Sequence, residues 1–400
     1  MKTIMIVGAG KSQVPLMKAA KNENYHTIVC DIDPDAPGVA LADEYFKVST
    51  KDRVELFEVA KNKYIDGIVA NSEYAMCDVA FIANRLGLVG NPESAITILS
   101  SKCKFRAMQK KAGLFAPDFI FGESIEKLKE EEFTFPVIIK PDQNSGTRGT
   151  SIVSDLDGYS MIHKNVLECT KISRNAKAIV EEYVKGSNFK GVEGEVFIHK
   201  GKILWDGLFL TLRSKLAPMI PMTYVFPLQE EEKKIKLLKE TLTKAFTAAN
   251  VVHGEYNVEL FFTDKDEPFI IEINPRQGGN DLPRYVQDHC GIDCYRLLVT
   301  TSMGDDAYWN SLTNFERKNK YITHHMLYPK EKGNFRGMQI DEAVLGYVYN
   351  SQLDINIGDE VEKTVDGASC IGYVDLVFPN AQEQMEVSVN LEELVKIRIE

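Results

Sequence analysis

The sequence lacks any run of about 18 apolar residues, so it predicts no membrane-spanning helix. Its seven cysteines are scattered without CxxC spacing, and its seven histidines form no HExxH-type pattern. These absences argue against a disulfide framework and a typical zinc site, and they predict a reduced, cytoplasmic protein. Cys290 and Cys294, four apart on a predicted helix, are interpreted as packing residues. His324 and His325 are adjacent on a predicted strand, so they should point to opposite faces.

Positive charge is also scarce, because 47 Lys and Arg stand against 58 Asp and Glu, for a formal net charge of −11. Such a chain is poorly suited to bind nucleic acid or an anionic membrane, and small-molecule partners are expected instead. A local nucleotide site needs only two or three cations and is not excluded. With 400 residues, 44% hydrophobic and 26% charged, the composition predicts a globular protein of several segments.

Three segments of the chain with different residue patterns predict three domains. Residues 1–100 alternate apolar strands, such as Thr3–Val7, with amphipathic helices, which predicts a Rossmann-like parallel α/β domain. Residues 101–305 combine strands, Gly-rich turns and a long amphipathic helix at Glu231–Asn250. Residues 306–400 are expected to form a small strand-rich subdomain without concentrated chemistry. The charged runs Glu123–Glu132 and Glu230–Lys236 are interpreted as solvated helix faces.

Two nucleotide-binding motifs near the N-terminus are incomplete. Gly10-Lys11-Ser12 ends like a P-loop, but Met5 stands where the first glycine is required. Gly8-Ala9-Gly10 begins a dinucleotide fingerprint with Asp31 at a suitable distance, but Gln13 occupies the third glycine position. The sequence therefore predicts the fold of a dinucleotide-binding domain without NAD binding.

A phosphate site is indicated in the middle of the chain. The apolar strand Val137–Lys140 ends in a lysine and is followed by residues 142–150, a loop rich in Gly, Ser and Thr. A lysine supplies a point charge for phosphate, and backbone amides and hydroxyls of such a loop can fold over anionic oxygens. A plain hairpin is the alternative interpretation.

A group of oxygen ligands is predicted farther along the chain. Glu272 and Asn274 are two apart on a predicted strand and share one face. A short turn should make the Glu259 strand antiparallel to it, which would bring the three side chains together. A few oxygen ligands of this kind suit Mg²⁺ completed by phosphate and water. Arg276 lies on the same face and could reach a phosphate, whereas a polar face turned to solvent is the alternative.

The order and spacing of these motifs resemble the ATP-grasp superfamily over nearly the whole chain. The segment Arg276–Pro283 is similar to one in its carbamoyl-phosphate-synthase-like and L-amino-acid-ligase-like members. The residues that carry the resemblance are Lys102, Lys140 with its loop, Glu181-Glu182-Tyr183-Val184, Glu259 and Glu272-Ile273-Asn274-Pro275-Arg276.

The resemblance implies roles for the matched residues. ATP phosphates would contact Lys102 and Lys140 beneath a covering loop of Ser145, Gly146, Thr147 and Gly149. Adenine would be recognised by the backbone of the hinge strand with Glu181, Glu182 and Val184. Mg²⁺ would bind Glu259, Glu272 and Asn274, and Arg276 would act with Lys140 on the transferred phosphoryl group. One departure is Asn188, where the family usually has a glutamate for the ribose. Glu193 could substitute for it.

The implied reaction is ATP-dependent carboxylate–amine ligation through an acyl-phosphate, with ADP and phosphate released. It would use two Mg²⁺ ions, with Mn²⁺ as a substitute. An amino acid is the expected substrate, and Arg213, Gly278, Gly279 and Asn280 are candidates to bind it. Arg213 could equally be a solvated loop residue, and Asn280 part of a helix cap. A kinase-like phosphotransferase and a non-catalytic ATP-binding regulatory protein are the alternatives, and a homodimer is left open.

Overall fold

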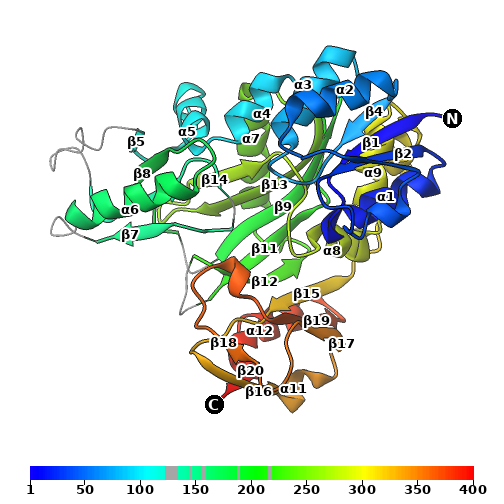
Figure 1. Cartoon of the computed structure of the whole chain (residues 1–400). Helices are drawn as coiled ribbons and strands as arrows, with labels where there is room; N and C mark the ends of the chain where they lie inside the picture. The colour runs from blue at the N-terminus through cyan, green and yellow to red at the C-terminus, as the bar shows by residue number, and fades with distance from the viewer. Residues whose placement is uncertain (122–133, 145, 155–158, 187–189, 215–218) are drawn as a thin grey trace.

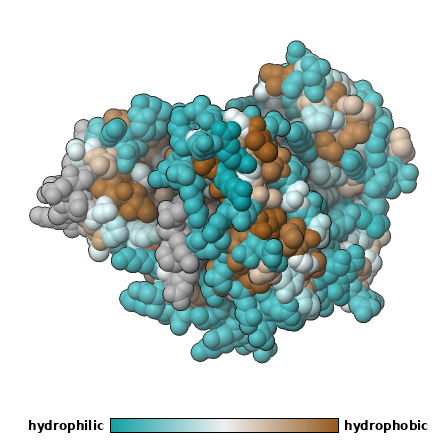
Figure 2. Space-filling model, turned by 90° about the horizontal axis from the view of Figure 1, so that it is seen from below, coloured by the Kyte–Doolittle hydropathy of each residue, from teal (hydrophilic) through white to brown (hydrophobic). Residues whose placement is uncertain are grey.

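The computed structural model describes residues 1–121, 134–144, 146–154, 159–186, 190–214 and 219–400. In the described part of the chain, no helix is both long and apolar enough to cross a membrane. Figure 1 shows the N-terminal sheet and the small sheet around β8 on opposite sides of a long central sheet, with the C-terminal residues below. Seen from below, most of the surface is hydrophilic, and hydrophobic side chains gather near its middle (Figure 2).

The N-terminal sheet is parallel, as the sequence predicts. Its strands are β1 (Thr3–Val7), β2 (His26–Asp31), β3 (Glu44–Lys47) and β4 (Gly67–Val69), in the order β3-β2-β1-β4. Alternate residues of β1 enter two different cores, one with α1 (Val14–Asn22) and one with α2 (Arg53–Asn62) and α3 (Met76–Leu86). The sheet is therefore covered on both faces. The sequence analysis missed β3 because it has no apolar run.

The central sheet is antiparallel and runs in the order β14-β13-β9-β11-β12-β15-β19-β17, with β10 paired to β9. Helix α7 (Glu232–Ala248) packs on it through an apolar face. The strand bounds are β9 (Lys190–His199), β10 (Lys202–Leu204), β11 (Leu208–Arg213), β12 (Pro221–Phe226), β13 (His253–Phe262), β14 (Pro268–Asn274), β15 (Tyr321–Met326), β17 (Val348–Leu353) and β19 (Gly372–Phe378).

Two smaller sheets complete the fold. The first consists of β5 (Phe119–Phe121), β8 (Ala178–Glu182), β6 (Val137–Pro141) and β7 (Ser151–Val153), with α6 (Tyr159–Ile172) against it. The second consists of β16 (Gly333–Ile340), β18 (Glu360–Val361) and β20 (Val395–Ile399). The remaining helices are α4 (Glu93–Leu99), α5 (Lys102–Lys111), α8 (Leu282–Cys290), α9 (Cys294–Ser302), α10 (Ala307–Ser311), α11 (Glu342–Leu345), α12 (Ala381–Ser388) and α13 (Leu391–Leu394).

The C-terminal segment is strand-rich, as expected, but it is not separate from the central sheet. Strands β15, β19 and β17 continue that sheet beyond β12. The domain boundaries at residues 100 and 305 therefore remain proposals. The charged run Glu123–Glu132 lies outside the described residues, whereas Glu230–Lys236 leads into the first turns of α7.

Two local expectations have different outcomes. Cys290 and Cys294 do not share a helix: Cys290 ends α8, Cys294 begins α9, and Gly291 between them has a positive φ of 87°. Their prediction on one helix was wrong because a left-handed glycine ends α8. His324 and His325 do lie on one strand, β15, and they bond in different directions, to Asp375 and to Thr223.

Candidate functional site

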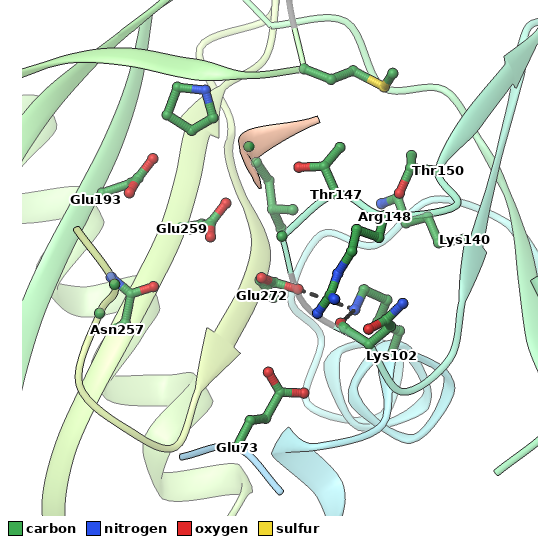
Figure 3. A pocket seen from close by; sticks show the side chains of 18 of the residues that line it. Glu73, Lys102, Lys140, Thr147, Arg148, Thr150, Glu193, Asn257, Glu259 and Glu272 are labelled. Atoms are coloured by element: carbon green, nitrogen blue, oxygen red, sulfur yellow. Dashed lines mark hydrogen bonds and ion pairs between the residues drawn. The ribbon is translucent and has the colours of Figure 1, made fainter. Parts of the chain in front are cut away.

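A cavity of about 1060 Å³ lies where the three main parts of the fold meet. Its walls come from loops of the N-terminal sheet, from β6 and β8 of the small sheet, from the central sheet, and from Tyr328 and Gly367 near the C-terminus. Figure 3 shows acidic side chains on one wall and the lysines and the 146–150 loop on the other. Each of these parts contributes a charged or polar side chain to the cavity, which is therefore the candidate site.

Three carboxylates form a row across the central sheet. Glu259 on β13 pairs in register with Glu272 on β14 and, on its other side, with Glu193 on β9. Asn274 belongs to the same group, because its Nδ2 donates to Glu272 Oε1 at 3.0 Å. The structure therefore brings together Glu259, Glu272 and Asn274 as their spacing predicts. It also adds Glu193, which the sequence analysis associated with ribose instead.

Burial and mutual repulsion shape the charge of this row. Burial, reinforced by Glu272 and Glu193, raises the pKa of Glu259 well above its usual range. Burial also raises the pKa of Glu193 to about 7. Glu272 differs: burial raises its pKa, but Lys102 and Asn274 outweigh burial and bring it to about 2. The Glu259 and Glu272 side chains are 24% and 21% exposed, so the alternative of a solvated polar face does not apply.

The donor set of this row fits a magnesium ion. Among the residues that the structure describes, no three His, Cys, Asp or Glu side chains could hold a metal by themselves. Two carboxylates and an amide oxygen leave coordination positions for phosphate and water, which is how Mg²⁺ usually binds beside nucleotides. The crowded acids also gain from a cation, because like charges at this distance raise one another's pKa.

Lys102 connects the carboxylate row to the 142–150 loop. It is the first residue of α5, after the N-cap Ser101. Its Nζ lies 3.3 Å from Glu272 Oε2 and donates to the carbonyl of Asn144 at 3.1 Å. The carboxylate of Asp142 in turn accepts hydrogen bonds from the Ser101 hydroxyl and the Cys103 amide. The start of α5 therefore holds the beginning of the loop beside the acids.

Lys140 is the penultimate residue of β6 and reaches into the cavity next to a buried ion cluster. Its Nζ lies 2.9 Å from Glu181 Oε2, and Arg106 Nε lies 2.8 Å from Glu181 Oε1, without the alignment of a hydrogen bond. Burial opposes ionisation of Glu181, but Arg106 and Lys140 together bring its pKa down to about 2. The Arg106 guanidinium also donates to the carbonyls of Ile270 and Ile271 on β14. The cluster therefore fixes Lys140 and joins β8 to the central sheet.

The loop after Lys140 borders the cavity from the small sheet. Strands β6 and β7 form a hairpin, and Gly146, Thr147, Arg148 and Thr150 of its loop line the cavity, whereas phosphate binding by this loop stays a prediction. Gly146, Thr147 and Gly149 have positive φ angles. Such angles favour glycine, which occupies two of these three positions. On the hinge side Glu182, Tyr183 and Val184 line the wall. Ser145 and Asn188 lie outside the described residues.

Arg276 lies two residues after Asn274, just beyond the end of β14, next to an acid that the sequence analysis missed. Its Nη2 is 3.7 Å from Glu73 Oε2, and its Nη1 donates to the carbonyl of Gln277. Glu73 also pairs with Arg174 at 2.7 Å. The signal for Glu73 was its place just after β4, because loops at the carboxyl ends of adjacent parallel strands gather ligand-binding groups.

The candidate substrate residues have different surroundings. Arg213 Nη2 lies 4.0 Å from Glu259 Oε2, and Asn280 Nδ2 donates to the hydroxyl of Tyr224 at 3.2 Å. Gly279 is exposed at the cavity wall. Asp281 caps α8 without a side-chain hydrogen bond, so the structure does not support the helix-cap alternative.

The N–H of Gly278, another candidate substrate residue, already has a partner in the structure. This amide donates to both carboxylate oxygens of the buried Glu195, at 2.9 and 3.1 Å. Glu195 also accepts a hydrogen bond from Asn257 at 2.9 Å. The sequence spacing could not reveal this contact, because Glu195 and Gly278 meet only through the pairing of β9 with β13.

We expect Gly278→Ala to lower turnover by about 10²-fold, because misplacing reacting groups by about 1 Å has effects of this size. An added Cβ would lie 2.3 Å from Glu195 Oε1 and 2.8 Å from Leu282 Cδ1, so the turn after Arg276 must move. Gly346→Ala is the matched control, since no atom lies within 4 Å of its added Cβ. Turnover and thermal unfolding of both variants check this; equal turnover would show that the turn adapts.

Comparison with known proteins identifies part of the chain. Residues 133–283 match the model of the ATP-grasp domain family. The carbamoyl phosphate synthase large chain of Thermotoga sp. (strain RQ2) is 24% identical over 322 residues, which are 75% of this chain and 28% of that protein. The L-arginine-specific L-amino acid ligase of Bacillus subtilis is 22% identical over 259 residues, 63% of this chain and 61% of that protein. The chain therefore spans less than two thirds of each relative.

Among solved structures, the L-amino acid ligase from Bacillus licheniformis superimposes with a TM-score of 0.79 at 17% sequence identity. The match covers 100% of this chain and 99% of that one. At this identity the likeness establishes the fold. The predicted fold class, a Rossmann-like α/β domain followed by an ATP-grasp fold and a strand-rich C-terminal segment, is confirmed.

Proposed function

Because the chain contains an ATP-grasp domain, we propose that it is an ADP-forming carboxylate–amine ligase that uses ATP and Mg²⁺. One observation carries this proposal: Lys102, Glu272 and Glu259 meet beside Arg276 in one cavity, under the loop that follows Lys140. This arrangement suits the transfer of a phosphoryl group. Negative charge develops on the phosphoryl oxygens during transfer, and cationic groups on several sides of the cavity can stabilise it.

ATP fits the cavity from the hinge to the carboxylate row. Its adenine would lie against Glu182–Val184, and its phosphates would lie between Lys140, Lys102 and the 146–150 loop. Mg²⁺, held by Glu259, Glu272 and Asn274, would offset negative charge on the phosphate oxygens. Arg276 would then bind the phosphoryl group as it leaves ADP, and the loop would exclude water from the product of transfer.

The proposed reaction has two steps. A carboxylate oxygen of the substrate attacks the γ-phosphorus, a new O–P bond forms, and the bond to ADP breaks. An amine nitrogen then attacks the acyl carbon, the C–N bond forms, and phosphate leaves with the former carboxylate oxygen while the nitrogen releases a proton. The amino-acid-ligase relative supports an amino acid as one substrate, with Arg213 and Asn280 close enough to the carboxylate row to contact it.

We expect ¹⁸O from a labelled carboxylate to appear in inorganic phosphate, one label for each amide formed. ATP, Mg²⁺ and a matrix of amino acids and other carboxylates would be incubated, and amide, phosphate and nucleotide measured by mass spectrometry and chromatography. The nucleotide should be ADP, because the cationic groups surround the γ-phosphate position.

Two outcomes would contradict the mechanism. AMP as the main nucleotide would mean attack on the α-phosphate, and unlabelled phosphate beside true amide would mean that the carboxylate was never phosphorylated. A kinase would instead keep the phosphate on its product, and a regulatory ATP-binding protein would produce neither amide nor phosphate.

A further inference from the structure

Glu193 is a buried acid that the proposed phosphoryl transfer does not use. It is 4% exposed, it lines the cavity from β9, and it points inward beside Glu259 (Figure 3). Among the described residues, neither of its oxygens takes part in a hydrogen bond or ion pair that the structure records, and Oε1 is fully buried. The neighbouring Thr211 hydroxyl has no recorded partner either. Arg213 is the cation whose charge most opposes the effect of burial on the pKa of Glu193. A buried carboxylate without a hydrogen-bond partner is costly, and a cationic ligand would lower that cost.

A magnesium ion held by Glu272 and Asn274 does not supply that cation. Glu193 and Glu272 lie on strands separated by β13, and neighbouring strands are about 4.8 Å apart. The two carboxylates are therefore on the order of 10 Å apart along the row. Magnesium binds oxygen at about 2.1 Å, so an ion held by Glu272 and Asn274 is out of reach of Glu193.

The wall around Glu193 combines a cation with apolar groups. Arg213, on the neighbouring strand β11, lines the same cavity, and its Nη1 donates to the carbonyl of Met219 at 2.9 Å. Met219, Pro221 and Tyr328 line this end as well. An acid and an arginine on neighbouring strands of one cavity wall can bind the ammonium and carboxylate groups of a zwitterion, and the apolar wall suits an apolar side chain.

We propose that Glu193 binds the ammonium group of an apolar α-amino acid, with Arg213 at its carboxylate. The ligand's nitrogen then lies next to Glu259, where the acyl-phosphate would form. After the ammonium passes one proton to the Glu193 carboxylate, the free amine attacks the acyl carbon, so this amino acid is the amine substrate and its own carboxylate is not activated. The identification as amine substrate rests on the proposed function, whereas binding at Glu193 does not.

Equilibrium binding tests the proposal without turnover. Calorimetry with ADP and Mg²⁺ present would use L-leucine, L-methionine and L-phenylalanine, each beside its N-acetyl and amide derivatives. The wild-type protein should bind at least one of the amino acids and should bind its N-acetyl form at least about 10-fold more weakly, because a charge-assisted contact is lost. Glu193→Gln should lower the affinity for the free amino acid by about 10- to 100-fold. The variant should then bind the free and the N-acetylated amino acid equally well.

Arg213→Met tests the other end of the ligand. This variant should bind an amino acid and its amide derivative equally well, because the contact with the carboxylate is lost. Glu240→Gln on the exposed face of α7 is the matched control for loss of one carboxylate, and it should bind like the wild type. Thermal unfolding verifies folding of each variant; Glu193→Gln should be no less stable than the wild type, because it replaces a buried carboxyl group that has no recorded hydrogen-bond partner.

Several results would overturn the proposal. Failure of all three amino acids to bind would do so, as would an unchanged preference for the free ammonium in Glu193→Gln. Weaker Mn²⁺ binding in Glu193→Gln, with unaltered amino-acid affinity, would make Glu193 a metal ligand instead. If the amino acids bind as expected but no amide forms in the labelling experiment, the proposed ligase function fails while the ammonium site stands.

Discussion

Replacing Glu272 with Gln is expected to abolish Mg²⁺-dependent turnover, with a fall of at least about 10³-fold, because a bound metal contributes several kcal/mol to stabilising the transition state. The amide keeps the size of the side chain but removes its anionic charge. Glu272 also holds Lys102 at 3.3 Å and accepts a hydrogen bond from Asn274 at 3.0 Å, so its loss affects a phosphate-facing cation as well.

Turnover across a Mg²⁺ titration, together with Mn²⁺ binding by electron paramagnetic resonance, measures this effect. Glu240→Gln serves again as the control, because that side chain is 62% exposed on α7. Near-normal activity of Glu272→Gln at ordinary Mg²⁺ concentrations would remove Glu272 from the metal site. Weak Mn²⁺ binding with a normal unfolding temperature would support its assignment.

Replacing Lys140 with Ala is expected to lower kcat/KM for ATP by about 10²-fold or more, because one cation is removed from the transferring phosphates. The same change leaves Glu181 with Arg106 as its remaining partner in the buried cluster. Removing one member of a buried ion cluster destabilises the fold, so activity and thermal unfolding must be measured together.

A second variant separates the two consequences. Lys140→Met keeps most of the length of the side chain and leaves the buried Glu181–Arg106 pair intact, so it should recover part of the stability lost in Lys140→Ala. Its turnover should stay as low as that of Lys140→Ala. If Lys140→Met regains wild-type kcat/KM, then Lys140 acts only through the packing of its side chain, and its role with ATP is wrong.

The sequence predicted features that depend on neighbours in the chain. The apolar strand before Lys140, the two-residue spacing of Glu272 and Asn274, and the short turn that pairs β13 with β14 are local signals. Strand periodicity and turn length determine which side chains share a face, so the carboxylate and amide oxygens could be grouped without a structure. The parallel N-terminal sheet was likewise visible, because strands buried on both faces are apolar throughout.

What the sequence determined by itself is therefore most of the order of elements, the ATP-grasp resemblance and many of the residues that gather at the cavity. Only the tertiary structure decided that Glu193 stands beside Glu259, that Glu73 meets Arg276, and that Glu195 occupies the Gly278 amide. Each of these contacts depends on the register between distant strands or on the packing of one sheet against another. Such pairings are set by burial and hydrogen bonding across the whole fold, and no local spacing encodes them.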